Sequence, residues 1–133
     1  MRKEYIIKAA QELKNKYGTS DPFSICRSMG VQIVYAPLTN RVRAFYQQMY
    51  GVDVIYLSDS LTPQEETVLL SHELGHCVLH RGLNAFFITR STLYPVAAFE
   101  READEFARCL LSGCDIDLIG VRAPVREILL PKG

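Results

Sequence analysis

The stretch that decides the fold is Val68-Leu69-Leu70-Ser71-His72-Glu73-Leu74-Gly75-His76-Cys77-Val78-Leu79-His80, an apolar run that contains the pattern H-E-x-x-H. Residues four apart on a helix lie on one face, so the imidazoles of His72 and His76 can converge on a single ion. Glu73 follows directly, where its carboxylate can hold a water molecule at that ion and take its proton. Two nitrogen ligands, an open coordination position and a neighbouring base are what a zinc peptidase requires.

Length and charge limit the other possibilities. The chain of 133 residues is 48% hydrophobic, which predicts a single domain over residues 1–133, with 114–133 as a short C-terminal extension. Fifteen basic and fifteen acidic residues cancel, which disfavours direct nucleic-acid or membrane binding. No apolar run approaches the roughly 18 residues of a membrane span, and the charged N-terminus does not resemble a signal peptide. We therefore expect a cytoplasmic protein.

Hydrophobic spacing around this stretch predicts an α+β domain. Helices are expected over residues 2–17 and 22–29, the second between an Asp21 cap and Gly30. β-Branched runs then predict strands at 31–35, 42–47 and 52–57, the last two forming a hairpin. This gives a small, mainly antiparallel sheet of three strands. Either arm of the hairpin could lie along a substrate cleft.

The helix that carries the histidines has the best-marked start in the chain. Thr62 and Glu65 form a capping box and Pro63 suits the first helical position, so the helix should run from Pro63 to about His80. Gly75 lies in its middle, which suggests close approach of another backbone. Residues 83–94 are expected to form a loop over the cleft. Further helices are expected from Pro95 to Gly113 and over 125–130.

A catalytic zinc site needs a third protein ligand. No histidine follows His80, so the candidates are Glu100 and Glu102, which lie about 200° apart on their helix and cannot both face one ion. Glu100 shares its face with Asp104, whose carboxylate could orient a ligand histidine. Glu102 has Phe106 one turn later and no such partner. We therefore favour Glu100, with Glu102 as the alternative.

His80 lies one turn beyond His76, and we expect it to support a ligand or to be a capping residue rather than to bind the ion. A closed site of three histidines and a glutamate would make the zinc structural and would leave Glu73 without a role. The expected cofactor is therefore one zinc ion, although Mn²⁺ or another divalent ion could occupy a site of two histidines and one carboxylate.

The segments 72–80 and 100–107, with Leu110-Leu111, resemble the ImmA/IrrE family of metallopeptidases, and Asp21-Pro22-Phe23 with Gly30-Val31-Gln32-Ile33 resembles its N-terminal region. The resemblance covers roughly residues 5–112. It implies a zincin-like, minimal gluzincin fold in which His72, His76 and Glu100 bind zinc, Glu73 is the base and Asp104 supports a ligand. It also implies a role in regulation, because family members cut or inactivate a repressor, often a helix-turn-helix protein of a mobile element.

Two functions remain open from the sequence. The first is a zinc-dependent endopeptidase that hydrolyses peptide bonds in a regulatory protein, such as a helix-turn-helix repressor. The alternative is a non-proteolytic binding module, an antirepressor or signalling domain, in which the zinc is structural. The intact Glu73 favours the first, because a purely structural site has no need of a base. The sequence gives no indication of the oligomeric state.

Overall fold

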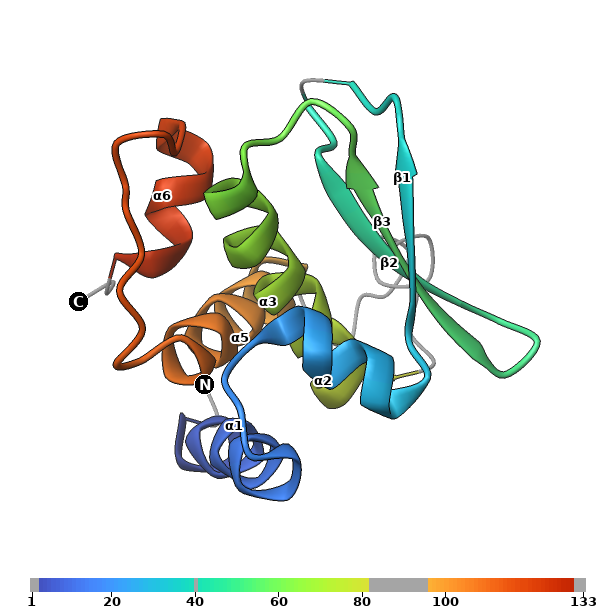
Figure 1. Ribbon diagram of the computed structural model, residues 1–133. Coiled ribbons are helices and arrows are strands. Elements are labelled where there is room, and N and C mark those ends of the chain that lie inside the picture. The colour runs from blue at the N-terminus through green and yellow to red at the C-terminus, as the bar shows by residue number, and fades with distance from the viewer. Residues whose placement is uncertain (1–2, 40, 82–95, 131–133) are drawn as a thin grey trace.

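The computed structural model describes residues 3–39, 41–81 and 96–130 (Figure 1). The predicted loop at 83–94 and the start of a helix at Pro95 lie outside the described residues. In chain order the elements are α1 (Lys3–Tyr17), α2 (Pro22–Met29), β1 (Gln32–Ala36), β2 (Ala44–Met49), β3 (Val52–Ser58), α3 (Pro63–Leu79), α5 (Val96–Leu110) and α6 (Ala123–Leu129). Within the described residues, no helix is both long and apolar enough to cross a membrane.

The local signals at the helix ends act as predicted. Asp21 caps α2 by accepting a hydrogen bond from the backbone N–H of Phe23, and Gly30 ends the helix in the left-handed conformation with φ of 78°. At the start of α3, Thr62 accepts from the backbone N–H of Glu65 at 3.2 Å, and the Glu65 carboxylate accepts from the backbone N–H of Thr62 at 3.1 Å. The capping box therefore fixes where the histidine-bearing helix begins.

The sheet has the strand order β1-β3-β2. Strands β2 and β3 form the predicted antiparallel hairpin, closed by Tyr50 and Gly51, both with positive φ as a tight two-residue hairpin turn requires. Strand β1 pairs with β3 in parallel, so the sheet is mixed rather than mainly antiparallel. Alternation of side chains indicates which residues form strands, but it does not fix the direction in which distant strands pair. The α+β, zincin-like fold class is confirmed.

Helix α3 lies at the centre of the molecule. Figure 1 shows it with the sheet on one side and α5 and α6 on the other. Ile55 and Leu57 of β3 are fully buried in the same core as Leu70 and Leu74 of α3. Burial of this kind supplies most of the stability of such a small domain.

Helices α3 and α5 pack unusually closely at Gly75. A Cβ atom at that position would lie 3.1 Å from Cδ1 of Phe106 and 3.2 Å from the backbone Cα of Ala103. Both neighbours belong to α5 and are fully buried. The close approach predicted from a glycine in mid-helix is therefore the contact that brings α5 against the histidine-bearing helix.

An ion pair between Arg122 and Glu65 joins the C-terminal segment to the start of α3. The Glu65 side chain is fully buried, and the Arg122 guanidinium donates to it through Nε at 2.8 Å and through a terminal nitrogen at 2.9 Å. The backbone N–H of Arg122 donates to the same carboxylate at 2.9 Å. Helix α6 follows at once, close to the short helix predicted at 125–130.

Candidate metal centre

Three side chains from two helices meet at one point. His72 and His76 lie on α3, and Glu100 lies on α5. Nε2 of His72 is 3.1 Å from Oε2 of Glu100, and Nε2 of His76 is 2.8 Å from Oε1 of the same carboxylate. Among the described residues, these three form the group whose donor atoms could share one metal ion, all within 4.8 Å of one another. Two histidine nitrogens and one carboxylate oxygen are a donor set that suits zinc and similar divalent ions.

The geometry of the cluster follows from its two helices. One turn of α3 separates His72 from His76, and their rings stand edge to face with centroids 4.9 Å apart. Helix α5 lies against the same face, which allows Glu100 to reach both rings. The rings are 7% and 8% exposed, whereas the Glu100 side chain is 51% exposed. The cluster is therefore buried on the histidine side and open to solvent at the glutamate.

Asp104, one turn after Glu100 on α5, contacts the other side of His72. Its Oδ1 lies 2.8 Å from Nδ1 of His72, a short distance although the N–H direction departs from a well-aligned hydrogen bond. Burial alone would lower the pKa of His72, but the carboxylates of Asp104 and Glu100 raise it to about 10. The carboxylates thus favour positive charge beside His72.

The same attraction acts on Glu100. Burial would raise its pKa, but the two histidines hold it well below the usual range of a glutamate. Ionised carboxylate and imidazole therefore face each other at the distance where an ion would bind both.

Glu73 lies beside the cluster with its carboxylate buried. Its Oε2 is 3.9 Å from Nε2 of His72, on the nitrogen that also faces Glu100. Burial raises the pKa of Glu73, and a hydrogen bond from the backbone N–H of Tyr46 in β2 acts against that rise. A carboxylate with a raised pKa next to a metal site has the properties of a general base.

His80 and Glu102 form a second contact between the two helices. Nε2 of His80 lies 2.7 Å from Oε1 of Glu102, and Nδ1 of His80 lies 3.0 Å from Nδ1 of His76. Glu102, the alternative third ligand in the sequence, therefore contacts His80 and is not part of the three-residue cluster. Residues compared along α5 alone do not indicate this contact, because His80 is the C-cap residue of α3, one turn beyond His76. Both ring nitrogens of His80 are engaged, and neither faces Glu100.

Residues 26–112 match the family model described as the IrrE N-terminal-like domain, a family of metallopeptidases. The chain belongs to this ImmA/IrrE family. A similar protein is the "Uncharacterized immunity region protein 2" of Bacillus phage phi105, which is 36% identical over 107 residues, or 80% of this chain and 68% of the relative. No solved structure matches the chain.

The region matched to the ImmA/IrrE family contains the whole cluster and the sheet beside it. Strand β3 pairs on both sides, so β2 is the arm of the hairpin with a free edge in the described sheet. The hydrogen bond from Tyr46 to Glu73 brings β2 next to the cluster. The Tyr46 hydroxyl donates to Asp53 at 2.6 Å, and Asp53 pairs with Arg81 at 2.9 Å, which ties the hairpin to the end of α3.

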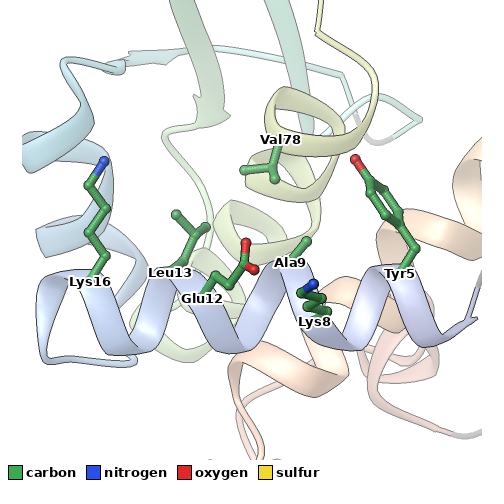
Figure 2. A pocket seen from close by; sticks show the side chains of 7 residues that line it. All are labelled: Tyr5, Lys8, Ala9, Glu12, Leu13, Lys16 and Val78. Carbon is green, nitrogen blue, oxygen red and sulfur yellow. The ribbon is translucent and has the colours of Figure 1, made fainter.

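A separate cavity of about 440 Å³ lies between α1 and the C-terminal end of α3 (Figure 2). Its lining comes from α1 and the end of α3: Tyr5, Lys8, Ala9, Glu12, Leu13, Lys16 and Val78. It contains neither a histidine nor any member of the three-residue cluster. Most of its wall also precedes the region matched to the ImmA/IrrE family, so the chemistry of that family concerns the cluster and not this cavity.

Proposed function

We propose that this protein is a zinc-dependent endopeptidase, with zinc held by His72, His76 and Glu100 and with Glu73 as the general base. The observation that carries the proposal is the convergence of three donor atoms within 4.8 Å beside a buried carboxylate. Membership of a metallopeptidase family supports the reaction class. The exposure of Glu100 supports a site that substrate can reach, as a catalytic rather than a structural metal requires.

Each residue has a defined task in this proposal. A bound zinc ion would supply a Lewis acid that polarises the scissile carbonyl and lowers the pKa of water at its open position. Glu73 would accept the proton of the attacking water and return it to the leaving amine. Asp104 would hold the His72 ring so that Nε2 presents its lone pair. His80 would hold the orientation of the His76 ring through the contact between their Nδ1 atoms.

The proposed substrate is an extended segment of a cytoplasmic regulatory protein, such as a helix-turn-helix repressor. The free edge of β2 beside the cluster supports an extended substrate, because a peptide can add to a sheet edge through main-chain hydrogen bonds. The name of the phage relative, an immunity region protein, supports a regulatory setting in a mobile element. Neutral net charge supports recognition of the repressor itself rather than of its DNA.

The metal site is tested by zinc content, measured by mass spectrometry on purified protein. We expect near-stoichiometric zinc in the wild type and loss of zinc in Glu100→Ala. A wild type that takes up no zinc when zinc is supplied would overturn the proposal.

The reaction is tested by mapping new protein N-termini in cells that contain either the wild type or Glu73→Gln. We expect termini that appear only with the wild type, while both proteins bind equal zinc. Cleavage that persists undiminished in Glu73→Gln would exclude Glu73 as the base. Regulation without any cleavage would favour the binding-module alternative.

A further inference from the structure

Glu102 is a buried charge that the proposed reaction does not use. Its side chain is fully buried on α5, and its described ion-pair partner is His80 at 2.7 Å. A carboxylate in such a place is costly unless it is paired and hydrogen-bonded. The Phe99 ring packs edge to face against His80, with centroids 4.4 Å apart, so the contact is also shielded from water. The desolvation cost of burying Glu102 indicates that its pairing with His80 has a functional role.

The direction of the hydrogen bonds from Glu102 through His80 to His76 indicates what that role is. An ionised carboxylate can only accept, so Nε2 of His80 must donate to Glu102. In a neutral His80 ring the other nitrogen, Nδ1, then carries a lone pair and accepts from Nδ1 of His76 at 3.0 Å. Nε2 of His76 is left with its lone pair, and that is the nitrogen which lies 2.8 Å from Glu100.

The arrangement parallels the one at His72. There, Asp104 contacts Nδ1 directly and leaves Nε2 to face Glu100. Both histidines of the cluster are thus backed by a carboxylate of α5, one in direct contact and the other through a third imidazole. Ligand histidines commonly depend on such partners for tautomer and ring orientation.

We propose that Glu102 is a positioning residue which, through His80, fixes the tautomer and ring orientation of His76 as a metal ligand. This inference rests on the proposed metal site. It gives Glu102 a role other than the ligand role considered from the sequence, and it gives His80 a function that requires both of its ring nitrogens.

The first experiment measures Zn²⁺ affinity by competition with a chelator in the wild type, Glu102→Gln and Glu105→Gln. Glu105 is a matched control, because it is a buried glutamate of the same helix that pairs with Arg108 at 2.7 Å. We expect Glu102→Gln to weaken Zn²⁺ binding about 10- to 100-fold, and Glu105→Gln to leave it within about twofold of the wild type. Equal affinities in the two variants would overturn the inference.

The second experiment is a double-mutant cycle with His80→Gln. If Glu102 acts through His80, the variant with both substitutions binds Zn²⁺ no more weakly than the weaker single variant. Additive losses would overturn the route through His80. Thermal melts of the metal-free variants separate a loss of affinity from a loss of folding.

The third experiment reads the tautomers directly, by ¹⁵N NMR of the imidazoles in the zinc-loaded protein. The chain has only three histidines, so each ring can be assigned. We expect His80 protonated at Nε2 and His76 protonated at Nδ1 in the wild type and in Glu105→Gln, with a mixed His80 signal in Glu102→Gln. His80 protonated at Nδ1 alone in the wild type would overturn the inference. A wild type that binds no Zn²⁺ would instead overturn the proposed function on which it rests.

Discussion

Replacement of Gly75 by alanine tests the close packing that assembles the site. The added methyl group would lie 3.1 Å from Cδ1 of Phe106 and 3.2 Å from Cα of Ala103, where ordinary carbon contacts are about 3.5–4.0 Å. To reach the lower end of that range, the neighbours must shift by about 0.3–0.4 Å. One of the two neighbours is backbone and the other is a fully buried ring, so we expect the shift to displace α5 relative to α3.

Two opposing terms set the expected magnitude. Alanine is favoured over glycine in a helix interior by about 1 kcal/mol. Overpacking of a well-packed core costs about 1–3 kcal/mol. We therefore expect Gly75→Ala to lower the free energy of unfolding by about 0–2 kcal/mol, rather than to raise it as helix propensity alone predicts. A shift of α5 also carries Glu100 away from His72 and His76, so Zn²⁺ affinity should fall about 10-fold or more.

Urea unfolding of the metal-free protein measures the first effect, and chelator competition measures the second. Gly120→Ala is the control, because a Cβ there meets its nearest neighbour, Oε1 of Gln64, at an ordinary 3.7 Å. We expect no change of Zn²⁺ affinity in the control. If Gly75→Ala were about 1 kcal/mol more stable than the wild type and bound Zn²⁺ equally well, the added methyl group would fit without displacing Glu100, and the reasoning would be refuted.

Three further predictions concern residues that position the histidine-bearing helix and its ligands. Thr62→Ala removes the acceptor for the backbone N–H of Glu65 and should lower the free energy of unfolding by about 1 kcal/mol in urea titrations. Thr39 also accepts from a backbone N–H, that of Val42 at 3.3 Å, but it caps no helix, so Thr39→Ala should have a smaller effect. Hydrogen bonds from Arg122 lower the pKa of Glu65 from 4.5 to about 2, so this carboxylate contributes stability above pH 4.5 that is lost as the pH falls towards 2. Thermal melts across this range should show that loss in the wild type and a weaker pH dependence in Arg122→Gln; equal slopes would contradict the role of the ion pair. Asp104→Asn should weaken Zn²⁺ binding about 10- to 100-fold in chelator competition, and unchanged affinity would show that His72 needs no carboxylate behind it.

The parts of the fold that sequence predicts are those with local causes. The capping box at Thr62 and the left-handed glycine at Gly30 place helix ends through contacts a few residues apart, and α3 and α2 begin and end accordingly. The helical period likewise places Glu100 and Asp104 on one face, and the structure brings both to the histidines. Such signals need no knowledge of which elements pack together.

The parts that sequence does not predict depend on pairing across long separations. The parallel pairing of β1 with β3 follows from how α2 and the sheet pack on α3, which side-chain alternation does not encode. The contact between His80 and Glu102 arises from the closeness of α3 and α5, so neither residue indicates it alone. Arg122 and Glu65 are 57 residues apart, and the sequence around Arg122 does not indicate that its partner is a buried carboxylate.

The ion pair between Arg122 and Glu65 has a consequence for where the chain can be cut. A polypeptide trimmed to residues 26–112 would keep all the proposed ligands, yet Glu65 would remain as a buried carboxylate without its guanidinium, at the first turn of the helix that bears the histidines. The same cut would remove Ile6 and Ala10 of α1, which are fully buried in the core. We expect such a fragment to unfold although it keeps every proposed ligand, because residues that stabilise the core and the start of α3 lie on both sides of the matched region.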